Sequence, residues 1–98
     1  MTLTKPRKSR ATRRRRAHLQ RLLRRQKWRC YWCQIKVMPY VAHGHPCKAT
    51  FDHLVTQSAG GGNALSNTVV ACYACNQRRR DTDAETWAAQ LAAERAGA

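Results

Sequence analysis

Acidic residues are scarce in this chain. Only five Asp and Glu accompany 19 Lys and Arg, so the formal net charge is +14 and the sequence pI is about 10.9. The first 29 residues hold thirteen of the cations and no acid. An excess of one sign, gathered at one end, is typical of a protein that binds a polyanion. Nucleic acid fits best; the alternatives are a solvated basic tail and a ribosome-like RNA binder.

Long apolar runs are also missing. No stretch approaches the roughly 20 residues that span a bilayer, and the charged beginning lacks the apolar core of a signal peptide. A helix lying on a membrane needs a broad apolar face, and the basic segment offers only Leu19, Leu22 and Leu23. We therefore expect no membrane partner and a cytoplasmic location.

The cysteine count is odd, which speaks against a framework of disulfides. In a reducing compartment the five cysteines are better explained as metal ligands. Two Cys-x-x-Cys pairs, Cys30 with Cys33 and Cys72 with Cys75, are separated by 38 residues. Two such pairs complete a tetrahedral zinc shell with no open position, which is structural rather than catalytic. A thioredoxin-like redox use is the alternative.

Outside the basic N-terminal segment, roughly 65 residues remain for a packed unit. A unit of that length often needs a metal ion or disulfides for stability. Zinc could then supply most of the folding free energy. The fifth cysteine, Cys47, stands near His43 and His45. These three residues could bind a second metal, but a loop with an incidental thiol is the commoner explanation.

The first half of the chain predicts a basic arm, a helix and a knuckle. Residues 1–9 have the composition of a disordered arm, and residues 10–28 are good helix formers. Residues 28–37 predict a tight knuckle between short strands, and residues 38–49, with two Pro and a Gly, predict a loop.

The second half predicts a hairpin followed by helices. Two strands, 50–55 and 68–71, should pair across a glycine-rich connection. Residues 72–80 should form a second knuckle that runs into a helix. The last helix is predicted from three features. Thr82 and Glu85 form a capping box, Trp87 and Leu91 are apolar residues four apart, and Gly97 is a plausible stop.

An adjacent Asp-His pair, Asp52 and His53, interrupts the first predicted strand. Strands are depleted in Asp, and alternation would place the two side chains on opposite faces. His53 can take a proton from water near neutral pH. Asp52 and Asn76 offer oxygens that suit a divalent cation. If both act on one substrate, Asp52 must reach the metal from a bulged or twisted strand end.

Four segments together resemble the HNH endonuclease family: "CYWC", "TFDHL", "SAGGGNALSN" and "CYACNQRRRD", from Cys30 to Asp81. The resemblance implies an α+β fold, the ββα-metal motif, stapled by the four-cysteine zinc site. It divides the chain into a basic arm and helix at 1–28, a nuclease core at 29–81 and a C-terminal helix at 82–98.

The family's three signature positions fall on His53, Asn67 and Asn76, the third usually being His. The resemblance implies that His53 is the general base and that Asp52 with Asn76 holds a catalytic cation, Mg²⁺ or Mn²⁺. Asn for His at the third position favours such a harder, oxygen-coordinated ion. Asn67 would tie the loop to the hairpin and orient the base. By itself Asn67 would equally be a turn residue.

Arginines supply the expected nucleic-acid contacts. Those before the core give affinity without sequence information, and those after Asn76 could clamp a phosphate. A solvated basic face is the alternative for the second group, and helical spacing prevents all three from reaching one phosphate. The candidates are Arg13, Arg14, Arg15, Arg16, Arg21, Arg24, Arg25, Arg78, Arg79 and Arg80.

The sequence therefore predicts a DNA-cleaving HNH endonuclease of low sequence specificity, resembling small stand-alone proteins of bacteriophages and mobile elements. A phage terminase is a candidate protein partner. Nicking and double-strand cleavage both stay open, as does the oligomeric state. The competing hypotheses are a non-catalytic, zinc-stabilised nucleic-acid-binding protein and an assembly protein on an inactive nuclease scaffold. The first gives no reason for Asp52, His53 and Asn76 to occur together, and the second predicts zinc but no second metal.

Overall fold

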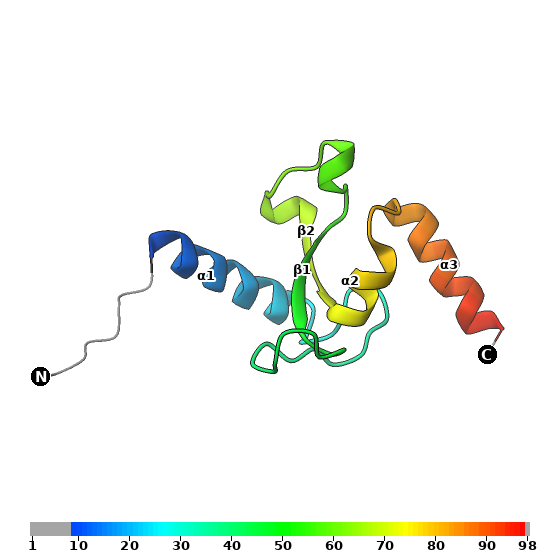
Figure 1. The fold of residues 1–98 in the computed structure, drawn as a ribbon, viewed down its shortest axis with the longest axis horizontal. Helices are drawn as coiled ribbons and strands as arrows, with labels where there is room; N and C mark the ends of the chain where they lie inside the picture. Colours follow the sequence, from blue (N-terminus) through cyan, green and yellow to red (C-terminus); the bar gives the residue numbers. More distant parts are fainter. Residues whose placement is uncertain (1–8, 98) are drawn as a thin grey trace, which may run out of the picture.

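The structure, a computed structural model, describes residues 9–97. A two-stranded antiparallel sheet lies at its centre, with helices on either side (Figure 1). This confirms the predicted α+β class. The elements in chain order are α1 (Arg10–Arg25), β1 (Ala49–His53), η1 (Gln57–Ala59), η2 (Leu65–Asn67), β2 (Thr68–Cys72), α2 (Tyr73–Arg79) and α3 (Ala84–Ala96). The predicted arm lies outside the described residues except for Ser9.

Helix α1 begins at a serine cap, because the Ser9 side chain accepts a hydrogen bond from the Thr12 amide. The helix ends at Arg25, three residues before the predicted Trp28. Lys27 and Trp28 both have positive φ, at 55° and 61°, so the chain turns away here. Leu22 and Leu23 are buried at 1% and 0% exposure and anchor the C-terminal half of α1 in the core.

The hairpin pairs residue for residue. Ala49 faces Cys72, and the register continues without interruption to His53 facing Thr68. The predicted pairing of these strands is confirmed. Of the two expected features of the strand end, a bulge or a twist, the bulge is absent beside Asp52. The outer edge of β2 is covered by Gln26, whose side-chain amide bonds both the amide and the carbonyl of Val70 at 2.8 Å. The Gln26 side chain thus makes the hydrogen bonds that a third strand would make to Val70, and it holds the end of α1 against the sheet.

The connection between the strands contains two single turns of 3-10 helix, η1 and η2, separated by glycines. Gly61 is required by space, since a Cβ there would lie 1.8 Å from the Val55 carbonyl oxygen. Gly60 is required by conformation, with φ at 90°. The glycines therefore let this loop fold back against the end of β1.

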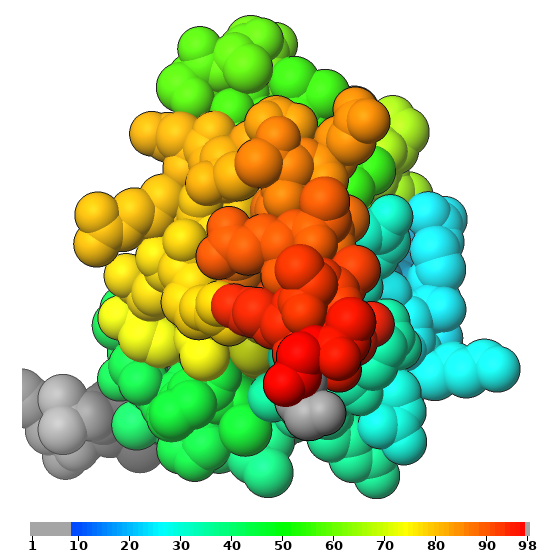
Figure 2. All heavy atoms as spheres, turned by 90° about the vertical axis from the view of Figure 1, so that its right-hand side faces the viewer, coloured from blue at the N-terminus to red at the C-terminus, as the bar shows by residue number. Residues whose placement is uncertain are grey.

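Helix α3 (Ala84–Ala96) begins one residue later than predicted, because its cap is Asp83 and not Thr82. Asp83, rather than Thr82, accepts a hydrogen bond from the Thr86 amide. Trp87 and Leu91 face the core, at 0% and 8% exposure, and burying side chains of this size contributes about 1.5–3 kcal/mol each. On the face shown in Figure 2, α3 lies between α2 and the segment around residues 25–35. The predicted stop at Gly97 is confirmed.

A single core joins these elements. It brings together the buried leucines of α1, the cysteine pairs, the inner residues of the hairpin and the two apolar anchors of α3. The Cys30 knuckle contains only an isolated bridge between Arg29 and Lys36, where short strands were predicted. Across residues 9–97, no helix combines the length and apolar character needed to cross a membrane.

Candidate active site and metal centre

The four cysteines of the two knuckles converge on one point. Their sulfur atoms all lie within 4.8 Å of one another, and Cys33 Sγ is 3.8 Å from Cys72 Sγ. Zinc–sulfur bonds of about 2.3 Å place tetrahedral sulfurs about 3.8 Å apart. The cluster can therefore hold a zinc ion with little adjustment. Because Cys72 caps α2 and Cys30 precedes the first knuckle's turn, one ion would join both halves of the core.

The metal-free thiols resist losing all their protons together. Burial is the main cause that raises the pKa of Cys75 to about 12. The hydrogen bond with Cys30 raises the pKa of Cys72, and the same bond lowers the pKa of Cys30 to about 5. One thiolate is therefore stabilised by its neighbours' protons. Binding a divalent ion to all four sulfurs must release the remaining protons.

The other histidine and cysteine group does not assemble. The four knuckle cysteines are the one metal-ligating group of three or more residues found within 9–97. His45 Nδ1 accepts a hydrogen bond from the Cys47 amide, and the His43 ring packs against Tyr73. The alternative of a second metal in this loop receives no support.

His53 opens onto a groove between the hairpin and α1. The groove has a volume of about 550 Å³. Its walls come from α1, the outer face of β1, the loop before β2 and the first residue of β2. The lining residues are Ala11, Arg14, Arg15, His18, Phe51, His53, Gln57, Asn63 and Thr68. The basic helix therefore forms one wall of the cavity that contains the candidate base.

The His53 ring is fixed by Asn63. Its Nε2 lies 2.8 Å from Asn63 Oδ1, which also accepts a hydrogen bond from Gln57. Because an amide oxygen only accepts, Nε2 carries the ring proton in a neutral His53. The unprotonated nitrogen is then Nδ1, the atom that can accept a proton from water.

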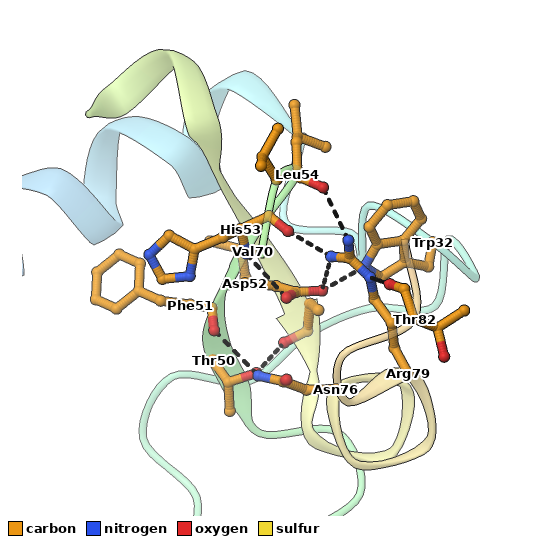
Figure 3. A network of polar contacts seen from close by, with 12 residues as sticks. Trp32, Thr50, Phe51, Asp52, His53, Leu54, Val70, Asn76, Arg79 and Thr82 are labelled. Carbon is orange, nitrogen blue, oxygen red and sulfur yellow. Dashed lines mark hydrogen bonds and ion pairs between the residues drawn. The ribbon is translucent and has the colours of Figure 1, made fainter. Parts of the chain in front are cut away.

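Asp52 points to the opposite face of β1, toward α2 (Figure 3). Its side chain is buried, and its Oδ2 accepts hydrogen bonds from Trp32 Nε1 at 2.8 Å and Arg79 Nη1 at 2.9 Å. Its Oδ1 accepts one hydrogen bond, from the His53 amide. Regular alternation thus separates the two side chains, and Asp52 is held by a buried cation.

Asn76 lies one turn before Arg79 on α2, on the same side of β1 as Asp52 (Figure 3). Its Nδ2 donates to Thr50 Oγ1 and to the Phe51 carbonyl, both at 3.0 Å. Arg79 donates in the same way to the carbonyls of His53 and Leu54. Helix α2 is therefore fastened along β1 by side-chain donors.

Asp52 and Asn76 each keep acceptor capacity for a cation. The Oδ1 of Asp52 receives a single hydrogen bond, and within residues 9–97 the Oδ1 of Asn76 receives none. Mg²⁺ binds through one or two protein oxygens, with waters and phosphate completing its shell. Each residue therefore offers an oxygen donor of the kind that such a hard cation prefers. They do not form a dense acidic site.

Asn67 links the loop to the end of β1. Its Oδ1 accepts from the Val55 amide at 2.8 Å, and its Nδ2 donates to the carbonyls of Val55 and Gly62. The structure therefore places Asn67 at the base of the loop that carries Asn63. Within residues 9–97, no hydrogen bond joins its side chain to His53.

The three arginines after Asn76 have different environments, and the prediction of a phosphate clamp is wrong for Arg79. Its side chain is fully buried and donates to Asp52 and to three carbonyls. Arg78 pairs with Glu94 at the surface, and Arg80 is exposed. The predicted arginines of α1 are all exposed: Arg13, Arg14, Arg15, Arg16, Arg21, Arg24 and Arg25.

The sequence did not reveal Trp32, Asn63 or Phe51 as parts of this site. Trp32 sits inside the first knuckle, and no local pattern pairs it with Asp52. Asn63 follows three glycines, a weak signal because Asn is common in turns. Phe51 lies two residues before His53, so alternation places it on the same face. It was the one of the three that sequence reasoning could have found.

Comparison with known proteins agrees with this geometry. The model of the HNH endonuclease family matches residues 30–82, which run from the first cysteine of the zinc cluster to just beyond the end of α2. The matched region includes both cysteine pairs, the hairpin and the His53 loop. No curated protein matches the chain.

Proposed function

Because this chain belongs to the HNH endonuclease family, we propose that it is a metal-dependent endonuclease that hydrolyses DNA phosphodiester bonds, with His53 as general base. The observation that carries the proposal is the His53 groove, in which a histidine of defined tautomer faces the arginines of α1. A base and unpaired cations in one cavity suit a phosphodiester, which brings both a reacting centre and a negative charge.

His53 Nδ1 takes a proton from a water molecule while the water oxygen bonds to phosphorus. The bond from phosphorus to one bridging oxygen breaks, and that oxygen takes a proton from solvent. The products are a phosphomonoester and a free hydroxyl. The hydrogen bond from Nε2 to Asn63 holds the ring in one orientation and leaves Nδ1 as the unprotonated nitrogen. Asn67 supports this arrangement by tying the loop to the strand end.

Asp52 and Asn76, on the opposite side of β1 from the His53 ring, would hold the catalytic cation, Mg²⁺ or Mn²⁺. When bound, it would offset charge on the phosphate and the leaving oxygen of a DNA backbone that lies across the end of β1. Arg79 pairs with Asp52, so its positive charge offsets the single negative charge that the two protein ligands supply. We expect the cation to bind weakly to the free protein and more tightly when a phosphate contributes its charge. The zinc cluster has a separate, structural role.

DNA is the proposed substrate and partner, because the charge of α1 suits a polyanion and the family model describes endonucleases. One site per chain supports nicking of single strands, and the contacts available from arginine side chains to phosphates do not select a base sequence. Low sequence specificity follows.

Plasmid nicking by the zinc-loaded protein tests this function. We expect nicking that needs added Mg²⁺ or Mn²⁺ and that falls by a factor on the order of 10² to 10⁴ in His53→Ala. Zinc content and far-UV circular dichroism of both proteins show whether the variant is folded. Absence of nicking by folded wild type with every metal would favour the alternative, a zinc-stabilised protein that binds nucleic acid without cleaving it.

A further inference from the structure

We propose that Arg14 and Arg15 of α1 form the binding subsite for the scissile phosphate opposite His53, and that Arg21 binds the next phosphates of the same strand. The proposal rests on the function proposed above and assigns α1 a part in the chemical step. A basic terminal segment would otherwise be a source of general affinity alone.

The first observation is that α1 is fixed against β1 on the His53 face. The guanidinium of Arg15 lies 5.1 Å from the centre of the Phe51 ring. The His18 ring, one turn further along α1, lies 5.5 Å from the same ring. Stacking on Phe51 occupies one face of the guanidinium and leaves its N–H groups at the edge free to bind an anion. Phe51 lies two residues before His53 on β1, so its contact with Arg15 holds this arginine on the His53 side of the strand.

The second observation is that these arginines carry uncompensated charge. All five acidic residues of the chain lie within the described region, and the ion pairs there join Asp52 to Arg79 and Glu94 to Arg78. Within that region, no carboxylate reaches Arg14, Arg15 or Arg21. Cations gathered on one helix repel each other, and an anion in the groove would relieve that repulsion.

The third observation is that the groove continues along α1. A second hollow of about 350 Å³ shares Arg14, His18 and Asn63 with the first and reaches Arg21 and Leu65. Seven residues of helix separate Arg14 from Arg21, which is about 10 Å along the axis. A nucleic-acid strand rises about 3.4 Å per nucleotide, so this track is about three nucleotides long. Arg13 and Arg16 line neither hollow.

Position in the groove decides what each arginine does. Charge on the phosphate oxygens increases as water attacks, and donors already aimed at those oxygens stabilise the transition state more than the ground state. Arg14 and Arg15 should therefore affect the rate of cleavage. Arg21, further from His53, should affect affinity. Arg13 and Arg16 can contribute to affinity only through their charge.

The test compares two double variants that lose the same charge. Arg14→Gln/Arg15→Gln should lower the single-turnover nicking rate at saturating protein by on the order of a hundredfold more than Arg13→Gln/Arg16→Gln does. Arg14→Lys/Arg15→Lys, which keeps the charge and loses the fork, should recover part of that loss. Arg21→Gln should raise Kd for a duplex with little change in the saturated rate. Zinc content and melting temperature report the folding of every variant.

A second measurement does not depend on cleavage. Inorganic phosphate should shift the His53 ring resonances in NMR spectra of wild type and of Arg13→Gln/Arg16→Gln, and should leave them unmoved in Arg14→Gln/Arg15→Gln. If wild type nicks DNA and the two double variants lose rate equally, the subsite is refuted while the nuclease function stands. If wild type does not nick DNA, the nuclease function fails, and the phosphate titration alone decides whether the subsite exists.

Discussion

Arg79 and Asp52 form a buried ion pair, with Arg79 Nη1 at 2.9 Å from Asp52 Oδ2. The guanidinium also stacks on the Trp32 ring, at 4.8 Å from its centre, and its Nε donates to the Thr82 carbonyl. A single side chain thereby joins the end of α2, the end of β1 and the first knuckle. A buried cation is tolerated here because a carboxylate and three carbonyl oxygens replace its water.

Removing this cation should be costly. We expect Arg79→Met to lower the free energy of unfolding by about 3–5 kcal/mol, because it leaves the Asp52 carboxylate buried without its partner. Arg78→Met removes the neighbouring arginine, whose pair with Glu94 is exposed, and should cost far less. Urea unfolding of the zinc-loaded proteins measures both. Equal losses from the two substitutions would show that the pair does not stabilise the fold.

Zinc should be needed for folding. Chelation of the metal should abolish the cooperative thermal transition, because the two halves of the small core meet at the four sulfurs. Wild type should contain one zinc per chain, and Cys33→Ser should contain less and melt earlier. Cys47→Ser serves as the matched thiol control and should keep its zinc. Elemental analysis and thermal melts decide the matter, and full zinc content in Cys33→Ser would argue against a four-cysteine site.

Asn63 should affect the rate of cleavage without affecting the fold. Asn63→Ala removes the acceptor that holds the His53 Nε2 proton, so we expect nicking to slow by about tenfold to a hundredfold, as when a hydrogen-bond partner of a functional imidazole is lost. Asn63→Asp keeps an acceptor and should retain more activity than the alanine variant. Single-turnover rates with zinc content as the folding control measure this effect. Indistinguishable rates in Asn63→Ala and wild type would mean that another group sets the tautomer.

Deletion of residues 1–16 should weaken DNA binding and make it less sensitive to salt. The deletion removes eight cations, and the slope of log K against log salt becomes shallower by about 0.9 for every phosphate that the protein no longer neutralises. It also removes Arg14 and Arg15 from the groove, so the truncated site is not intact. Fluorescence anisotropy at several salt concentrations, in a His53→Ala background that prevents cleavage, gives the slopes. An unchanged slope would place the DNA elsewhere on the surface.

The cap of α3 can be assigned by a pair of neighbouring substitutions. The hydrogen bonds from Thr86 hold the pKa of Asp83 below its usual value, so its stabilising charge is complete at neutral pH and is lost only as pH falls through that lowered pKa. At pH 7, Asp83→Ala should lower the melting temperature more than Thr82→Ala does. Circular dichroism melts of both variants test this. A larger loss of melting temperature in Thr82→Ala than in Asp83→Ala would support Thr82 as the cap.

Patterns that depend on local spacing were correctly predicted from the sequence. Two Cys-x-x-Cys pairs can present four sulfurs to one ion, and the β-branched runs on either side of a glycine loop predict a hairpin. Both features are present, because a tight turn and a strand are decided by residues close in the chain. The exact ends of α1 and α3 were wrong by one to three residues, since competing caps and turns such as Lys27 differ little in local free energy.

The direction in which each side chain points was decided by the tertiary structure. Arg78, Arg79 and Arg80 look alike in the sequence, yet successive helical residues are turned by about 100°, and the docking of α2 on β1 selects Arg79 for burial. In the same way, regular strand pairing turns Asp52 toward α2 and His53 toward α1, where the sequence predicted a bulged or twisted strand end. The composition alone predicted a polyanion partner. The contacts of Leu22, Leu23 and Gln26 with the sheet, made across more than 40 residues of chain for Gln26 and Val70, bring the arginines of α1 beside His53.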